Sequence, residues 1–558
     1  MRQTGTPVSA TGRAEQSEAS KLILLLLLTC AWLLPGLVGH DPWKPRDAVT
    51  FGVVHHMLIS GDWLVPAIAG ETTFEHGPFY YWVAALLARL LAGWLPLHDA
   101  ARLASGLFVA ASFLALGYAG RLLMGPGLGR PTVVVLLGCV GLITNGHEMQ
   151  PDTAVLAGYA LALAGFALLA QGRLSGGVLL GQGLGMAFLA SGPTPVVVLG
   201  LTALLLPFFP QWRSRTYGRG LVLAGFASLP WLAIWPALIA RRAPEWLHRF
   251  WQESGRGLIE FSFGHFPGQL AYYAELLTWF AWPALPLAVW TLLGYRRKLL
   301  VEPRYQLPLV FFGVVLGVLS GMPQRSDTLA LPLLLPLALL AAAGIDTLRR
   351  GAANALGWFG IMGFGAAALF LWVAWLALMT GVPARFASHL LELVPGYVPR
   401  FSWTPFLVAL LLTFFWLLPL RRSFRSGRRA AVNWAAGITL FWGLLATLWL
   451  PWLDHGRSYA RPFLDLKAHL PAHYTCIAGA GLSDAHRALL YYYAGLRVRR
   501  VEDFEGMECD LFLLQWNPRT PETRPGPGWV RLWEGGRPGE KRERFRLLRF
   551  EGGINERS

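Results

Sequence analysis

Residues 21–38 read KLILLLLLTCAWLLPGLV, an apolar run whose only charge is at its first residue. A run of this length can cross a bilayer as a helix. It lacks a small-residue cleavage site followed by a soluble domain, so we interpret it as a retained anchor rather than a cleaved signal peptide. Comparable runs recur as far as residue 452. The sequence therefore predicts a polytopic, mainly α-helical membrane protein.

The composition supports this class. Of 558 residues, 54% are hydrophobic and only 14% are charged, which is too apolar for an ordinary soluble enzyme. The net charge of +16 does not indicate nucleic-acid binding, because the positive residues fall in short clusters between apolar runs. Short basic loops mark the cytoplasmic side of a membrane. The clusters are Arg121 to Arg130, Arg173, Arg213/Arg215/Arg219, Arg296/Arg297/Lys298/Arg304, Arg349/Arg350 and Arg421/Arg422/Arg425/Arg428/Arg429.

With these clusters in the cytoplasm, the sequence predicts about thirteen spans, a cytoplasmic N-terminus and an outer C-terminus. The expected domains are a cytoplasmic tail at 1–20, a membrane domain at 21–455 with an outer first loop at 40–99, and an outer domain at 456–558. The spans are placed at about 21–38, 100–123, 131–147, 152–171, 176–190, 193–209, 220–240, 271–293, 306–321, 328–347, 355–380, 404–420 and 431–452.

One apolar stretch, residues 78–95, is excluded from this count. If it crossed the membrane, every later basic cluster would face outward, and Arg89 in its middle makes a crossing costly. We therefore expect a helix that lies in the outer interface. The alternative is an ordinary span with an irregular hairpin elsewhere.

The last hundred residues differ in character from the membrane domain. Residues 474–481, 509–516, 529–535 and 544–550 have the pattern of strands, and 483–496 that of a helix, which together predict a small α/β domain. Cys476 and Cys509 both lie in it, and an oxidising compartment would allow a disulfide. Spacing alone does not show whether they pair.

The predicted outer loops collect most of the acidic and histidine residues, as expected of a polar pocket at the membrane surface. No P-loop or G-x-G-x-x-G motif follows a predicted strand, and the predicted cytoplasmic loops are too short for a nucleotide-binding domain. An enzyme on the outer face then needs an activated substrate that reaches it through the membrane. A lipid-phosphate-linked donor meets that need, because Arg or Lys can pair with its phosphate.

The stretch 43–82 resembles the first outer loop of the GT-C glycosyltransferases, in the group of aminoarabinose transferases (ArnT-like) and protein mannosyltransferases. That loop typically contains W-x-P-D-E, then M-L-x-S-G-D-W-x-V-P, then F-E-K-P-P before an aromatic pair. The matching residues here are Trp43, Pro45, Met57-Leu58, Ser60-Gly61-Asp62-Trp63, Val65-Pro66, Phe74-Glu75 and Pro78. Pro151-Asp152 resembles the second acidic loop of the family, and the aromatic segment 261–273, the span count and the C-terminal domain extend the resemblance to the whole chain.

The resemblance implies a GT-C fold and an enzyme of the bacterial inner membrane, surrounded by membrane lipids. Such enzymes move a sugar from a polyprenyl-phosphate carrier to an acceptor such as lipid A, a protein or another envelope glycan. The sequence departs from the family at the motifs that matter most. Arg46-Asp47 stands where the family has Asp-Glu, His76-Gly77 where it has Lys-Pro, and Ala190-Ser191-Gly192 where it often has Thr-Lys-Gly.

Glycosyl transfer needs a carboxylate base near the acceptor hydroxyl, unless the acceptor is already an anion. It also needs cations that stabilise the departing phosphate. We therefore expect catalytic roles for Asp47, Glu75 and Asp152. The residues expected to bind substrate are Arg46, His76, Arg256, Arg325 and Tyr81.

Several of these residues have a structural alternative. Asp47 and Asp152 could each cap the helix that follows, a common task for Asp. Asp62 is better explained as a turn residue. His55 and His56 would point about 100° apart on a helix, which makes a shared metal ion difficult. No cofactor is assigned, and a divalent metal stays open.

Two other function classes also stay open. A transporter or flippase usually places ionisable residues at the membrane midplane and often has repeated halves. The predicted spans carry few such residues, which disfavours transport. A GT-C protein that only binds a lipid-linked glycan, without catalysis, is the second alternative, because the altered motifs affect the catalytic positions.

Overall fold

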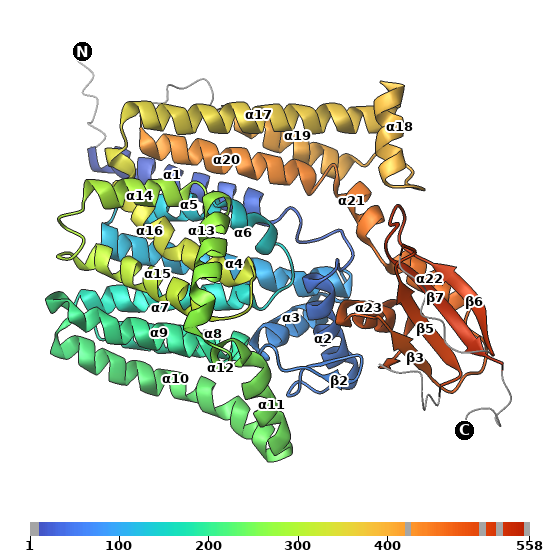
Figure 1. The fold of residues 1–558 in the computed structure, drawn as a ribbon. Coiled ribbons are helices and arrows are strands. Elements are labelled where there is room, and N and C mark those ends of the chain that lie inside the picture. Colours follow the sequence, from blue (N-terminus) through green and yellow to red (C-terminus); the bar gives the residue numbers. More distant parts are fainter. Residues whose placement is uncertain (1–9, 419–425, 502–508, 520–527, 552–558) are drawn as a thin grey trace, which may run out of the picture.

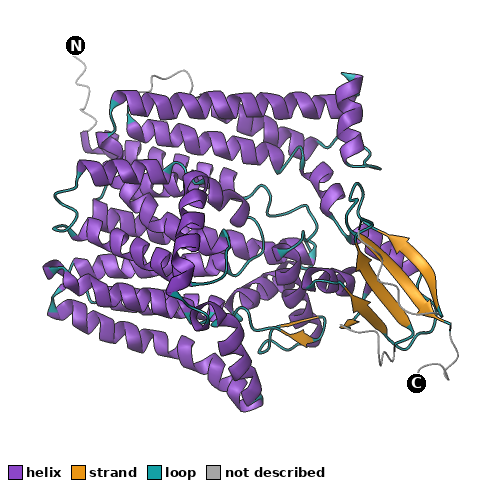
Figure 2. Cartoon of the chain, viewed as in Figure 1, coloured by secondary structure: helices purple, strands orange, loops and turns teal. Residues whose placement is uncertain are grey.

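The computed structural model of the chain describes residues 10–418, 426–501, 509–519 and 528–551. Long helices make up most of the molecule, and a sheet lies at one end of it (Figures 1 and 2). The predicted basic residues Arg421, Arg422 and Arg425 lie outside the described residues, as does the first part of the N-terminal tail. The fold class predicted from the sequence is confirmed.

The first helix and the first loop place the candidate site. Helix α1 (Ala10–Leu33) carries the first apolar run and begins within the segment expected to be a tail. The first loop then contains α2 (Arg46–Ser60), the two-stranded hairpin β1 (Ala67–Ile68) and β2 (Glu71–Thr72), and α3 (Phe79–Leu91). Helix α3 has 13 residues, or about 20 Å at 1.5 Å per residue. It is therefore too short to cross a hydrocarbon core of about 30 Å.

By length and composition, the described residues contain six helices that could cross a membrane, or up to eight if each of two bent pairs counts as one span. The predicted number of thirteen is not reached by this measure. The six are α4 (Leu97–Met124), α7 (Asp152–Ala170), α10 (Arg215–Arg242), α15 (Pro303–Gly321), the helical segment Thr328–Thr347 that contains α16 (Leu334–Gly344), and α17 (Arg350–Thr380).

Three of the predicted spans are not continuous helices. Segment 131–147 divides into α5 (Gly129–Leu137) and α6 (Val140–Asn145), since Cys139 between them is extended. Segment 271–293 bends by 103° between α13 (Phe266–Phe280) and α14 (Ala284–Gly294), where Pro283 has no N–H to continue the helix. Segment 431–452 bends by 59° between α20 (Gly427–Leu445) and α21 (Leu450–Arg457).

The centre of the bundle is α7, which packs against α4 and against α8 (Ser175–Ser191). Small residues let these backbones approach closely, as is common between membrane helices. A Cβ atom on Gly158 would lie 2.6 Å from the carbonyl oxygen of Gly183, so only glycine fits there. The remaining helices of this part are α9 (Thr194–Leu205), α11 (Pro244–Ser254), α12 (Arg256–Ile259), α18 (Ala384–Leu393) and α19 (Trp403–Leu417).

The C-terminal part forms a five-stranded sheet in the order β4-β3-β5-β7-β6. Strands β4, β3 and β5 are parallel, and β7 and β6 run antiparallel to their neighbours. The four strands and the helix expected from the sequence are present, and Cys476 and Cys509 form a disulfide. The elements are α22 (Ala460–Ala468), β3 (Ile477–Ala480), α23 (Asp484–Ala494), β4 (Val498–Arg500), β5 (Leu511–Trp516), β6 (Trp529–Gly535) and β7 (Arg544–Phe550).

This C-terminal part packs directly on the first loop (Figure 1). Helix α23 lies against α2 so closely that a Cβ atom on Gly52 would be 2.4 Å from the Cβ of Ala488. Lys44, just before α2, donates a 2.6 Å hydrogen bond to Glu543. The sheet therefore supports the helix that carries Arg46 and Asp47.

Candidate active site

Asp47 occupies the first turn of α2 and is sealed from solvent. Its carboxylate accepts hydrogen bonds from the Arg102 guanidinium and from the Met149 backbone N–H, each 2.8 Å long. The Trp43 N–H donates a third bond of 3.2 Å. Burial acts to raise the pKa of Asp47, but Arg102 outweighs it and holds that pKa below its usual value. The carboxylate is thus a fixed anion that ties the first loop to α4 and to the 146–151 loop.

The alternative that Asp47 caps α2 is not what the structure contains. The helix begins at Arg46, its N-cap position is Pro45, and no side chain makes a capping hydrogen bond there. Asp152 likewise occupies the first helical position of α7, with Pro151 at the N-cap and no side-chain cap. Asp62 does act in a turn, because its carboxylate accepts the Leu64 N–H at 3.0 Å.

Arg46 points away from Asp47 and links the start of α2 to two segments that are distant in sequence, one around 145–148 and one at 327. Its guanidinium donates to Asp327, and to the Asn145 side-chain oxygen at 3.2 Å. Glu148 lies 3.8 Å from the same guanidinium. The Arg46 and Glu148 side chains each keep 35% of their surface exposed. We call this group of Arg46, Asn145, Glu148 and Asp327 the open cluster.

Glu148 has the most informative ionisation of this cluster. Burial, followed by the negative charge of Asp47, raises its pKa to about 7, although Arg46 acts against the shift. A carboxyl group with a pKa near neutrality can both accept and donate a proton under ordinary conditions. Glu148 and Asp327 lie in the predicted outer loops, but neither they nor Asn145 are among the residues for which the sequence predicts a role in the site. The available signal was the position of Glu148 and Asp327 close to Asp152 and Arg325 in the predicted outer loops.

The second matched motif, residues 74–78, borders the same region. The Phe74 N–H donates to Glu253 at 2.7 Å, and the Gly77 N–H donates to the Ala190 carbonyl at 3.2 Å. A Cβ atom on Gly77 would lie 2.1 Å from the Leu189 carbonyl oxygen, which explains glycine at this position. The motif is therefore held against the end of α8 on one side and against α11 on the other.

Within this motif Glu75 is exposed and His76 is half-buried. The His76 Nδ1 atom is buried without a hydrogen-bond partner among the described residues. Asp152 lies close enough to His76, Arg46 and Asp327 for their charges to act on it. Burial raises the pKa of Tyr81, and the neighbouring carboxylates of Glu75 and Asp152 add to the effect. Residues of both first-loop motifs, Arg46 and His76, therefore lie within electrostatic range of Asp152.

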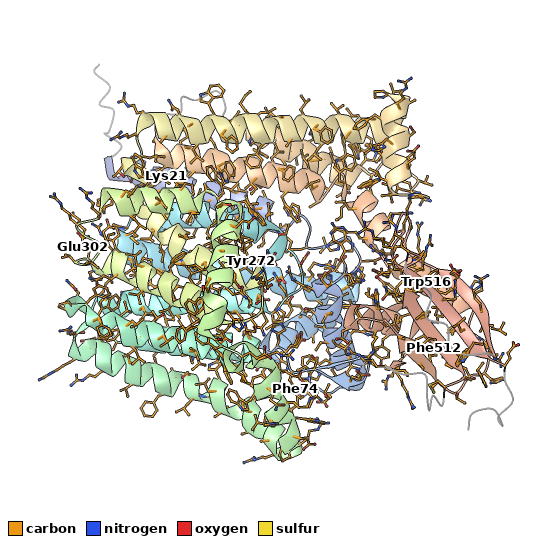
Figure 3. All side chains as sticks on the ribbon, in the orientation of Figure 1. Lys21, Phe74, Tyr272, Glu302, Phe512 and Trp516 are labelled. Carbon is orange, nitrogen blue, oxygen red and sulfur yellow. A yellow bond between two sulfur atoms is a disulfide. The ribbon has the colours of Figure 1, made fainter. Side chains whose placement is uncertain are left out.

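The two remaining arginines predicted to bind substrate differ in their placement. Arg325 lies over the Tyr272 ring at 5.8 Å, and the charges of Arg46, Arg325 and Asp327 all act on Tyr272. In Figure 3 Tyr272 lies beside α13, within the helical bundle. Arg256 instead pairs with Glu260 at 3.2 Å and is 69% exposed. No contact among the described residues joins Arg256 to the open cluster.

Across the described ranges, no group of three His, Cys, Asp or Glu side chains gathers as a metal site. His55 and His56 pack instead against α23, where the His55 ring lies 5.3 Å from that of Tyr491. The positive charge nearest to Glu148 and Asp327 belongs to Arg46. The site therefore combines carboxylates with fixed cations of the protein, a set that suits a phosphate-bearing substrate.

A helical membrane domain, a C-terminal sheet and this charged site at their junction are the organisation expected of a membrane glycosyltransferase of the GT-C class. Comparison with solved structures agrees: the fold matches the crystal structure of ArnT from Cupriavidus metallidurans bound to undecaprenyl phosphate, with a TM-score of 0.67, 17% identity and coverage of 97% of this chain and 98% of that one. The apo form of the same protein matches with a TM-score of 0.68. No protein-family model matches the chain.

Sequence relatives identify the family more narrowly. The chain is 30% identical, over 468 residues, to the undecaprenyl phosphate-α-4-amino-4-deoxy-L-arabinose arabinosyl transferase of Pseudomonas aeruginosa, covering 80% of this chain and 78% of the relative. It is 28% identical to the enzyme of the same name from Edwardsiella ictaluri, over 69% of this chain and 70% of the relative. The chain belongs to this arabinosyl transferase family and is an integral, multi-pass membrane glycosyltransferase.

Proposed function

We propose that this protein transfers 4-amino-4-deoxy-L-arabinose, or a closely related sugar, from undecaprenyl phosphate to a lipid A or other envelope acceptor. The identity of 30% to a named arabinosyl transferase over most of both chains carries the donor assignment. The open cluster and the nearby Arg325 support it, because a phosphate-linked sugar needs cations around its phosphate and a carboxylate near its anomeric carbon.

In this proposal Arg325, His76 and Arg46 surround the phosphate of the donor. The acceptor oxygen attacks the anomeric carbon while the bond from that carbon to the phosphate oxygen breaks. The phosphate gains the bonding electron pair, and the neighbouring cations stabilise the added charge. Asp152, Glu75 and Tyr81 orient the sugar. Arg256, which pairs with Glu260 at the edge of the site, contacts the incoming lipid.

We assign the proton-accepting role to Glu148 rather than Asp47. Asp47 already accepts bonds from Arg102, Met149 and Trp43, so its oxygens have no room for an acceptor hydroxyl. Glu148 is partly exposed and has a pKa of about 7, raised first by burial. Asp47 then serves as the residue that positions the 146–151 loop through Met149.

The proposal also includes an orientation. The N-terminus and the basic loops lie on the cytoplasmic side of the bacterial inner membrane, and the first loop and residues 456–558 lie in the periplasm. The separation in Figure 1 supports this, since α10, α17 and α20 begin at the end of the bundle away from the sheet. Cysteines introduced near Asp62 and Gly479 should react with a membrane-impermeant reagent, and one near Arg215 should not. Labelling near Arg215 from outside would reverse the orientation.

The activity is tested with purified full-length protein in lipid nanodiscs. Undecaprenyl phosphate-linked aminoarabinose and lipid A are supplied, and the modified acceptor is measured by mass spectrometry. Transfer by the unmodified protein and its loss in Glu148→Gln, with donor binding retained, is the expected result. Donor binding without transfer to any tested acceptor would favour the non-catalytic alternative. Transfer from a nucleotide sugar alone would contradict the donor assignment.

A further inference from the structure

A second site lies at the end of the bundle remote from the open cluster. Helices α1, α5 and α20 leave a groove there with a volume of about 610 Å³. Its walls are apolar and include Leu24, Leu28, Val134 and Val432. Lys21, which also lines it, lies in Figure 3 far from Phe74 of the first loop and from Trp516 of the sheet. The groove is therefore separate from the site of sugar transfer.

Basic side chains border this apolar groove. Lys21 and Arg130 share one carboxylate, because both pair with Glu18, at 2.7 and 2.6 Å. Arg428 pairs with Asp346 at 2.6 Å and also donates to the Gly127 carbonyl. With one carboxylate between two cations, the Lys21 and Arg130 side of the mouth carries excess positive charge. It also has N–H donors to spare, since an ammonium has three and a guanidinium five.

The shape and the charge together select one kind of occupant. A volume of this size lies within the usual range for a small-molecule site and is too small for a packed protein domain. An acyl chain matches the apolar walls, which are open to the surroundings along α1, where Leu24 is 66% exposed. A phosphate matches the basic mouth, and basic pockets between membrane helices are suited to anionic lipid headgroups.

We propose that the groove between α1, α5 and α20 binds an anionic glycerophospholipid, with its phosphate at Lys21 and Arg130 and an acyl chain along Leu24 and Val432. The bound lipid fills the space between α1 and the rest of the bundle. The site is independent of the proposed sugar donor, whose phosphate belongs to the opposite end of the protein.

The test uses the full-length protein in phosphatidylcholine nanodiscs. A small fraction of phosphatidylglycerol carrying a photoreactive diazirine in its acyl chain is included, and labelled peptides are mapped by mass spectrometry. Label is expected in α1 around Leu24 and Leu28 and in α20 around Val432. Unlabelled phosphatidylglycerol should compete for this labelling, and neither phosphatidylcholine nor undecaprenyl phosphate should do so at equal concentration.

Substitutions then assign the label to the groove. The double variant Lys21→Ala/Arg130→Ala should reduce labelling about tenfold, because charge-assisted contacts to the phosphate are removed. The matched control Arg215→Ala/Arg219→Ala removes two exposed arginines from the same end of the bundle, on α10, and should leave labelling unchanged. Leu24→Trp, at an exposed position, should block the groove without removing an ion pair.

The proposal fails if a phosphatidylcholine probe labels the groove equally well, or if both the double variant and Leu24→Trp retain full labelling. It also fails if undecaprenyl phosphate is the better competitor. Size-exclusion profiles of the variants, recorded before labelling, show that loss of label reflects loss of the site in a folded protein.

Discussion

Two neighbouring residues of one helix, Arg46 and Asp47, belong to charge clusters of opposite kinds. Asp47 pairs with Arg102, and their side chains are 2% and 0% exposed. Arg46 pairs with Asp327, and their side chains are 35% and 32% exposed. We call the first group, Asp47, Asp99 and Arg102, the sealed cluster. The difference shows that a charged pair in a sequence motif does not reveal which member holds the fold and which remains available for chemistry.

The helix itself explains the division. Successive residues on an α-helix point about 100° apart, so the two side chains at the start of α2 face different neighbours. One faces α4, where Arg102 satisfies two carboxylates and three backbone carbonyls. The other faces the loops that carry Glu148 and Asp327. Buried charges persist only when fully paired, whereas partly exposed ones can exchange partners.

Substitution in the sealed cluster should have the largest effect on the thermal stability of the protein. Arg102→Met leaves Asp47 and Asp99 buried without their cation, and loss of one partner of a buried pair costs about 3–5 kcal/mol. We expect a marked fall in the unfolding temperature in detergent, with loss of activity as a consequence. Arg89→Met, which removes an exposed arginine from α3, is the control. Unchanged thermal stability of Arg102→Met would mean that the sealed cluster is not structural.

Glu148→Gln should separate chemistry from stability. The change removes the ionisable group of the open cluster but keeps its shape, so we expect turnover to fall about 10²-fold with a nearly unchanged unfolding temperature. Glu392→Gln, at an exposed residue of α18 with no role in the proposed site, is the matched control. If Glu148→Gln retains full turnover, the acceptor is itself an anion or the base lies elsewhere.

The pH dependence of turnover should also distinguish Glu148 of the open cluster from Asp47 of the sealed cluster. Glu148 accepts a proton only when ionised, and its pKa is raised to about 7, first by burial. Turnover should therefore rise about tenfold per pH unit below that value and level off above it. Glu148→Gln should lose this ascending limb. The pKa of Asp47 is lowered, so Asp47 stays ionised over this range and cannot produce the limb. An identical limb in Glu148→Gln would assign it to another group.

The smallest effect is expected for Arg46→Lys. Lysine keeps the positive charge beside Glu148. It lacks the planar guanidinium with which Arg46 donates to Asp327 and Asn145 at the same time. We expect turnover to fall roughly threefold to tenfold, measured with saturating donor, with little change in thermal stability. A larger fall than in Glu148→Gln would place Arg46, rather than Glu148, at the centre of the chemistry.

The first-loop motifs are readable in the sequence, and they predict a catalytic role for Asp47, which stands in the matched motif. Glu148 follows a predicted span and has no motif of its own, so nothing local distinguishes it. The partner that seals Asp47, Arg102, lies 55 residues away on α4. The partner of Arg46, Asp327, is 281 residues away. Contacts over such separations leave no periodic pattern in a single sequence.

The helix boundaries also fall into two groups, those that the sequence predicts and those that it does not. The positions of the long helices could be predicted from the apolar runs, because hydropathy over about 20 residues is a local property of the sequence. The breaks at Cys139 and Pro283 were not predicted, although Pro283 was visible as a residue that lacks an N–H. Whether a proline ends, bends or merely interrupts a helix depends on which neighbours satisfy the freed backbone groups.

The sequence by itself determined the class of this protein: a multi-pass membrane chain with a GT-C first loop and a C-terminal α/β unit. These features depend on composition, local periodicity and short motifs, each of which can be read from residues that are near one another in the sequence. Only the tertiary structure decided that Asp47 is sealed while Glu148 is open, and that a basic-rimmed groove lies between α1, α5 and α20. Burial and electrostatic environment arise from residues far apart in sequence, so they exist only once the chain has packed.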